Sequence, residues 1–170
     1  KVLNTAQLDH FFSKDSYPLF AVSFYNLIPS CYSCNHVKLN KDLKHSPYDS
    51  SFSFDDVKFT YIPKSTDKIE IKIDSRNPDF KNGIRILGIE ELYQSHIDVV
   101  NELIWKKEVY SDSYRDGLSK ILNQTDLELS EAELNRFITG HYTDKGNYGK
   151  RPLSKMVTDI SKEIGLIGEK

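Results

Sequence analysis

Three strings of residues near the N-terminus carry the most informative pattern of the chain: Leu8-Asp9-His10-Phe11-Phe12, Phe24-Tyr25-Asn26-Leu27-Ile28-Pro29 and Cys31-Tyr32-Ser33-Cys34-Asn35-His36-Val37-Lys38. Carboxylate, imidazole, amide and thiol groups are all present in them, whereas residues 1–50 contain no long amphipathic period. A segment with many reactive side chains and little periodicity indicates a functional site rather than a bulk hydrophobic core.

The first and third strings contain the parts of a phosphodiester hydrolase. Asp9 offers a hard carboxylate and Asn35 an amide oxygen, both of which suit Mg²⁺ or Mn²⁺, and His10 is a base that works near neutral pH. In a strand, Asp9 and His10 point to opposite faces. We therefore expect a bulge or the end of a strand at this place, so that both side chains reach one site.

The order of the three strings resembles the ββα-metal motif of the HNH endonucleases. The matching residues are Asp9-His10, Asn26-Leu27-Ile28-Pro29-Ser30-Cys31 and Cys34-Asn35-His36-Val37-Lys38. The resemblance covers roughly the first 50 residues as a motif, and the longer run looks like a bacterial subgroup that is found beside ATPases in anti-phage and restriction-type systems. The chain departs from the family at Leu39, where glycine is common, and we expect the helix to continue beyond Lys38.

The resemblance implies a role for each matching residue. His10 is expected to be the general base that activates water, and Asp9 and Asn35 the ligands of one catalytic Mg²⁺ or Mn²⁺ ion. Asn26 is expected to brace the loop between the strands and to orient the base, since an amide donates and accepts at once. Lys38, one helical turn beyond Asn35, is expected to approach the scissile phosphate or an adjacent one. The implied activity is hydrolysis of DNA phosphodiester bonds.

Cys31 and Cys34 are the only cysteines, and their spacing suits a metal ion better than a disulfide. Many members of the family hold a structural Zn²⁺ with two C-x-x-C pairs, so the resemblance implies that these two residues form half of a zinc site. Because tetrahedral Zn²⁺ needs four ligands and the chain begins at Lys1 without a methionine, we expect the second pair to lie upstream. His36 and His45 are the alternative ligands within the chain. If neither explanation holds, the cysteines are buried and bind no metal.

The charge balance gives only local support for binding to DNA. The chain has 23 Lys and Arg residues against 25 Asp and Glu residues, and its net charge is −2. A modest excess of lysine lies between Cys34 and Ser46, where Lys38 and Lys41 are the candidates for contact with nucleic acid. Part of the affinity for DNA is therefore expected to come from a region upstream or from a partner such as an ATPase subunit.

Composition and hydropathy exclude two classes of protein. Hydrophobic residues make up 38% of the chain, which is enough for a packed core and excludes general disorder. No apolar run approaches the roughly 20 residues that span a bilayer, and the N-terminus lacks the regions of a signal peptide. The sequence thus predicts a cytoplasmic protein without a membrane partner.

The middle of the chain predicts a β-hairpin. Residues 57–61 and 69–73 alternate in character around a Pro-Lys-Ser-Thr-Asp turn, which is typical of two half-buried strands. Asn77-Pro78 and Asn82-Gly83 follow the hairpin and indicate a loop.

The C-terminal half predicts a helical region. Apolar residues at spacings of three and four form one stripe over 89–107, and shorter stripes follow over 114–122, 134–138 and 153–164. Ser130 and Glu133 suit a capping box for the third helix, with Gly140 at its end, and Pro152 suits the start of the fourth.

Together these patterns predict an α+β protein with three parts. A ββα-metal (HNH) nuclease core over 1–50 is followed by a β-hairpin and connecting loops over 51–88 and by a helical region over 89–170. The predicted function is that of a metal-dependent HNH endonuclease acting on DNA. The alternative is a non-catalytic module, stabilised by zinc, that binds nucleic acid or protein; it has no need of a base such as His10 beside a hard ligand such as Asp9.

Overall fold

The structure is a computed structural model that describes residues 6–50, 53–65, 68–122 and 130–168. It divides into two units, which we describe separately. The N-terminal unit consists of Lys1–Val57 and Asp74–Leu92, and the C-terminal unit consists of Lys58–Ile73 and Tyr93–Lys170. Helices and strands are both present, and the strands form two separate antiparallel pairs, so the predicted α+β class is confirmed.

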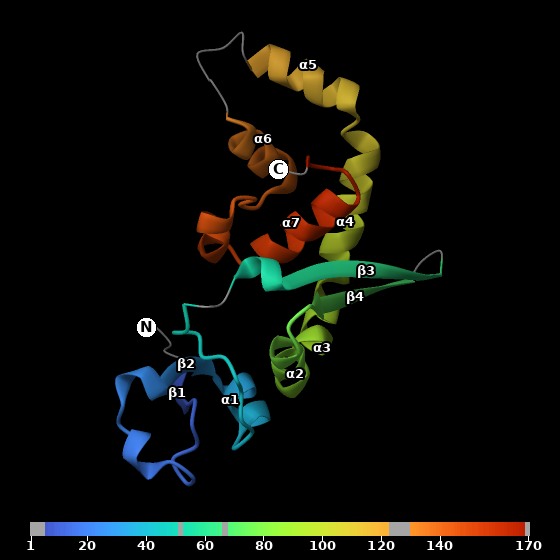
Figure 1. Ribbon diagram of the computed structural model, residues 1–170. Coiled ribbons are helices and arrows are strands. Elements are labelled where there is room, and N and C mark those ends of the chain that lie inside the picture. The colour runs from blue at the N-terminus through green and yellow to red at the C-terminus, as the bar shows by residue number, and fades with distance from the viewer. Residues whose placement is uncertain (1–5, 51–52, 66–67, 123–129, 169–170) are drawn as a thin grey trace, which may run out of the picture. The chain divides into compact units, whose positions relative to one another are not determined.

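The N-terminal unit is built around one pair of short strands. Strand β1 (Ala6–His10) pairs antiparallel with β2 (Leu27–Cys31), and Asp9 lies opposite Ile28 in the register. Helix α1 (Tyr32–Lys38) follows β2 directly and contacts both strands (Figure 1). The connection between the strands contains two single 3-10 turns, η1 (Pro18–Phe20) and η2 (Phe24–Asn26).

Helix α1 ends at Lys38, so the predicted extension of this helix is wrong. The N–H of Leu39 still donates to the carbonyl of Asn35 at 3.0 Å, but the backbone of Leu39 then adopts a φ of 48°. A right-handed helix cannot continue through that conformation, which glycine adopts without strain and which costs a leucine roughly 1–2 kcal/mol. The chain thus ends α1 with a leucine in a conformation that favours glycine.

The segment after the hairpin is a helix, and the loop predicted at Asn82-Gly83 is wrong. Helix α2 spans Pro78–Leu87. The Asn77 side chain accepts from the N–H of Asp79 at 2.9 Å, Pro78 occupies the first turn, and Gly88 closes the helix with a φ of 61°. These are standard start and stop signals, and they outweigh the Asn-Gly pair inside the helix. Helix α2 contacts α1 in the N-terminal unit.

The β-hairpin of the C-terminal unit is longer than the sequence predicts. Strand β3 spans Val57–Ser65 and β4 spans Lys68–Ser75. The N–H of Phe59 donates to the Asp159 carboxylate at 2.9 Å, and the Thr60 hydroxyl donates to Glu163 at 2.7 Å. Both acceptors belong to helix α7 (Ser154–Glu163), so most of the hairpin joins the helices. This division differs from the predicted separate part over 51–88.

The predicted continuous helix over 89–107 is interrupted. Helix α3 (Ile89–Tyr93) is followed by the 3-10 turn η4 (Gln94–His96) and then by α4 (Ile97–Val109). The Gln94 side chain donates to the carbonyl of Ile71 at 2.8 Å and accepts from its N–H at 3.1 Å. These bonds tie the turn to strand β4, a tertiary contact that a local period does not encode.

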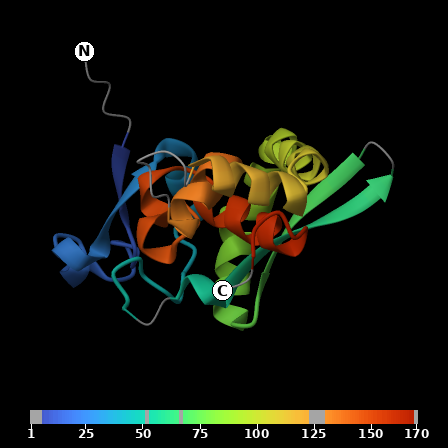
Figure 2. The ribbon, with the colours of Figure 1, turned by 90° about the horizontal axis from the view of Figure 1, so that it is seen from above.

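The remaining helices follow the sequence prediction closely. Helix α5 spans Asp112–Leu122, and α6 spans Glu131–Thr139 with the predicted capping box and Gly140. Helix α7 begins at Ser154, two residues after Pro152, and lies against α4 (Figures 1 and 2). The buried side chains of this unit include Ile71, Val100, Leu103, Ile138, Met156, Val157, Ile160 and Leu166.

Two short 3-10 segments complete the elements, η3 (Phe54–Asp56) and η5 (Lys145–Lys150). The second contains the Gly-Asn-Tyr-Gly string as a turn. Among the described residues, no helix is both long and apolar enough to cross a bilayer.

Candidate functional site

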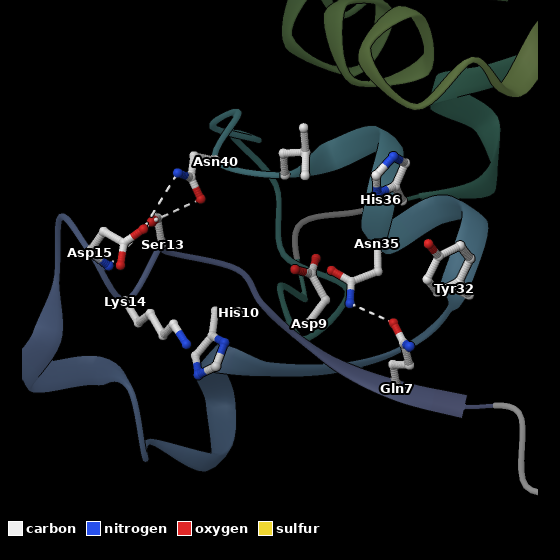
Figure 3. A pocket seen from close by; sticks show the side chains of 11 residues that line it. Gln7, Asp9, His10, Ser13, Lys14, Asp15, Tyr32, Asn35, His36 and Asn40 are labelled. Carbon is white, nitrogen blue, oxygen red and sulfur yellow. Dashed lines mark hydrogen bonds between the residues drawn. The ribbon is translucent and has the colours of Figure 1, made fainter.

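The end of strand β1 brings Asp9 and His10 to one cavity. His10 is the last residue of the strand, so the alternation of side chains stops there. A cavity of about 250 Å³ is lined by both residues together with Gln7, Lys14, Tyr32 and Asn35 (Figure 3). The structure therefore meets the requirement for a strand end that the sequence raised.

The His10 ring is held by a backbone carbonyl. Its Nε2 atom lies 3.0 Å from the carbonyl oxygen of Ala21. A carbonyl oxygen can only accept, so Nε2 carries the proton in this contact. In the neutral ring, Nδ1 then holds the free lone pair, and this is the atom that is able to take a proton.

Asn26 braces the loop between β1 and β2. Its side chain is 3% exposed; its Oδ1 accepts from the N–H of Phe12 at 2.7 Å, and its Nδ2 donates to the carbonyls of Phe12 and Phe20 at 3.1 and 3.0 Å. Phe20 precedes Ala21, whose carbonyl holds His10. Asn26 thus braces the backbone on both sides of the loop that holds the His10 ring; that it orients a catalytic base stays a prediction.

Lys38 lies beneath Asp9 instead of facing solvent. It is 3% exposed, and its Nζ lies 3.2 Å from the nearer oxygen of the Asp9 carboxylate and 2.6 Å from the carbonyl oxygen of His10. The resemblance predicted that Lys38 binds a phosphate. The Lys38 ammonium instead points into the N-terminal unit, because α1 places this residue over the end of β1. Its contacts with protein acceptors make it a support for both site residues.

Lys41 stays exposed, and its Nζ donates to the carbonyl of Val37 at 3.1 Å. That contact caps the last turn of α1, as lysine commonly does. A contact between Lys41 and nucleic acid stays a prediction.

Asn35 faces Asp9 from helix α1. Its Nδ2 donates to the Gln7 side chain at 2.9 Å, which leaves the amide oxygen directed toward the Asp9 carboxylate (Figure 3). Gln7, on strand β1, is a residue that sequence reasoning missed. Its signal was its position two residues before Asp9, which puts both on the same face of the strand.

The oxygen atoms of Asp9 and Asn35 fit a hard divalent ion. Mg²⁺ commonly takes only one or two protein ligands and keeps several waters, and a carboxylate that already accepts from one lysine retains further lone pairs. Among the described residues, no group of three or more His, Cys, Asp or Glu side chains is placed to hold a metal. The two-ligand arrangement therefore suits Mg²⁺ or Mn²⁺ rather than a closed structural site.

Cys31 and Cys34 lie at the start of α1 as free thiols. Cys31 is exposed and Cys34 is partly exposed, so neither fits the expected buried alternative. The Cys31 sulfur accepts from the N–H of Cys34 at 3.4 Å, and this bond lowers the pKa of the Cys31 thiol. A hydrogen bond with the Cys31 side chain raises the pKa of Cys34, and burial raises it further.

Cys31 and Cys34 belong to no group of three metal-binding side chains in the part of the chain that the structure describes. His36 stacks on Tyr32 with ring centroids 5.7 Å apart, and His45 packs on Phe80 at 4.1 Å. No described group of three metal-binding side chains includes either histidine. The zinc site with a second pair upstream stays a prediction.

Comparison with known proteins gives no independent assignment. No family model matches the chain, and neither a curated protein nor a solved structure matches it. The functional argument therefore depends on the side chains at the cavity and on their geometry.

Proposed function

We propose that β1, β2 and α1 form a ββα-metal core of the HNH type and that the protein is an endonuclease hydrolysing DNA phosphodiester bonds. One observation carries this proposal: His10, with its Nε2 bound to Ala21, lines the same cavity as the oxygen ligands Asp9 and Asn35. A base beside a pair of hard ligands is the minimum equipment for metal-assisted hydrolysis of a phosphodiester.

The role of His10 in this reaction follows from its hydrogen bond. Its Nδ1 accepts a proton from the water that attacks phosphorus in line with the leaving 3′ oxygen, and the P–O3′ bond breaks. The positive charge that forms on the ring is stabilised at Nε2 by the Ala21 carbonyl. A histidine that acts as a general base commonly takes the proton on one ring nitrogen while the other donates to an acceptor that orients the ring.

Asp9 and Asn35 would hold the Mg²⁺ or Mn²⁺ ion. When bound, such an ion stabilises negative charge on the phosphate and on the leaving oxygen. Lys38 holds the Asp9 carboxylate in place, and Gln7 keeps the Asn35 oxygen turned toward the ligand position. Each of the two proposed ligands, Asp9 and Asn35, is thus held in place by a neighbouring side chain.

Cleavage of supercoiled plasmid tests the proposal directly. Wild type is expected to nick or linearise the plasmid with Mg²⁺ or Mn²⁺ and to do neither with EDTA. His10→Ala is expected to lower the rate at least about a hundredfold, the lower end of what a general base contributes. His96→Ala is the matched control, because His96 lies in η4 of the C-terminal unit. Equal rates in wild type and His10→Ala, at equal folding by circular dichroism, refute His10 as the base.

The rival function is a zinc-stabilised module that binds nucleic acid or protein without cutting. The observation that favours it is the exposed Cys31–Cys34 pair at the start of α1. Metal analysis separates the two functions: zinc alone, without any Mg²⁺ or Mn²⁺ dependence of activity, supports the module.

A role in anti-phage defence and an ATPase partner follow from the resemblance to HNH endonucleases, and both belong to the nuclease proposal.

A further inference from the structure

The candidate cavity contains a lysine that none of the motif strings includes. Lys14 extends from the loop after β1 and lines the cavity on the side of His10 (Figure 3). It is exposed, and its ammonium makes no hydrogen bond or ion pair with the described residues. An ammonium without a protein acceptor at a site for phosphodiesters is available to a ligand.

The two lysines that the motif suggested, Lys38 and Lys41, are already engaged. Lys38 is buried against Asp9 and the carbonyl of His10, and Lys41 bonds to the carbonyl of Val37. Neither lines the cavity. Within the described part of the N-terminal unit, Lys14 is the lysine that combines a place on the cavity wall with a free ammonium.

The backbone around Lys14 is fixed by its neighbour Ser13. Ser13 is 7% exposed, its carbonyl accepts from the N–H groups of Ser16 and Tyr17 at 3.2 and 2.8 Å, and its hydroxyl accepts from the N–H of Asp15 at 3.3 Å. The turn therefore presents Lys14 from a defined position. An anchored turn reduces the backbone entropy that the loop loses when Lys14 binds a ligand.

The nearest carboxylate in sequence does not neutralise Lys14. Asp15 also lines the cavity, but its carboxylate accepts from the side-chain amide of Asn40 at 3.5 Å (Figure 3). No ion pair between Lys14 and Asp15 is present among the described residues. Two sides of the cavity thus differ. The oxygen atoms of Asp9 and Asn35 lie on one side, and the Lys14 ammonium lies on the other (Figure 3).

We infer that Lys14, and not Lys38, is the lysine that binds the DNA backbone, at a phosphate adjacent to the scissile bond. This inference rests on the proposed nuclease function. An ammonium has three donors and no acceptor, so a non-bridging phosphate oxygen is its natural partner. Lys14 is a substrate-binding residue of the site; it takes no proton in the reaction.

The test compares Lys14→Met, Lys14→Arg and the control Lys58→Met. Lys58 is an exposed lysine of β3 in the C-terminal unit, so its removal changes the net charge equally. The first readout is binding of a fluorescent 20-base-pair duplex in EDTA, measured by anisotropy over a range of salt concentrations. One lost phosphate contact lowers the slope of log K against log salt by about one, and we expect this for Lys14→Met alone.

The second readout is plasmid cleavage in Mg²⁺. Lys14→Met is expected to raise KM roughly tenfold and to change kcat less than about threefold, because it removes a contact made equally in the ground and transition states. Lys14→Arg keeps the charge and is expected to restore most of the affinity. The melting temperature of Lys14→Met serves as a check on folding. Because Lys14 is exposed and has no partner among the described residues, its replacement should leave the melting temperature unchanged.

The outcomes separate the two proposals. If wild type cleaves with Mg²⁺ and Lys14→Met has the same salt slope and KM, the assignment of Lys14 is overturned and the nuclease function stands. If wild type neither binds duplex nor cleaves plasmid, the function and the assignment fall together. A lower slope and higher KM in Lys14→Met, but not in Lys58→Met, support the inference.

Discussion

The contact between Lys38 and Asp9 leads us to predict that removing the Lys38 ammonium lowers the free energy of unfolding of the N-terminal unit. Lys38→Met keeps the length of the side chain and removes the ammonium. The Asp9 side chain, 11% exposed, then loses its cation, and the carbonyl of His10 loses a donor at 2.6 Å. Breaking a buried pair costs about 3–5 kcal/mol. Because Asp9 also borders the cavity, where water reaches it, we expect about 3 kcal/mol.

Hydrogen exchange is the suitable assay, because the chain has two units. The single tryptophan, Trp105, lies on α4 in the C-terminal unit, so its fluorescence does not report on the N-terminal one. The amides that pair β1 with β2 do report on it. A loss of about 3 kcal/mol speeds their exchange roughly a hundredfold.

A double-mutant cycle tests the cause. Asp9→Asn removes the buried charge, so combining it with Lys38→Met is expected to cost clearly less than the sum of the two single changes. Lys41→Met, which removes an exposed lysine from the segment after α1, is the control and should change stability by less than about 0.5 kcal/mol. Exchange at β1–β2 that is unchanged in Lys38→Met refutes the reasoning and returns Lys38 to the role of a phosphate contact.

Two further predictions follow from the same unit. Asn26→Ala removes three hydrogen bonds and is expected to cost about 3 kcal/mol, at about 1 kcal/mol each; Asn26→Asp should be at least as harmful, because a carboxylate oxygen then faces two carbonyls. Exchange at β1–β2 measures both, and an Asn26→Asp variant as stable as wild type contradicts the orientation of the amide. Since the pKa of Cys31 is lowered and that of Cys34 raised, iodoacetamide near neutral pH should modify Cys31 first. Peptide mass spectrometry decides the order, and faster modification of Cys34 would refute the asymmetry.

The regular elements could be predicted where local signals agree with one another. The capping box at Ser130 and the stop at Gly140 both bracket α6, and alternation identified the strands of the hairpin. Helix α2 was missed because Asn82-Gly83 was given more weight than Asn77 and Gly88, which are the cap and the stop. The interruption at Gln94 depends on a bond to Ile71, far away in the chain, and no local period reveals such a contact.

The candidate site shows the same limit. The resemblance grouped Asp9, His10 and Asn35, and the structure does place all three at one cavity. The direction of a flexible side chain is set by its surroundings, so the sequence could place Lys38 on α1 but could not show that it turns inward. Gln7 was missed although it lies two residues before Asp9 on the same face of β1, because its bond to Asn35 is known only from the fold.

The hydrogen bonds of Asn26 join the two ends of a segment in the loop between β1 and β2, and we call these joined ends the stem of the loop. Phe12 and Phe20 are both tied to the one amide, and His10 is tied to Ala21 just beyond it. The segment from Ser13 to Leu19 is therefore a ring that the Asn26 amide closes at its base. Lys14 lies within that ring. One part of the loop, its stem, thus holds the His10 ring, while another part presents Lys14, so a substitution of Lys14 is expected to leave the contact between His10 and Ala21 intact.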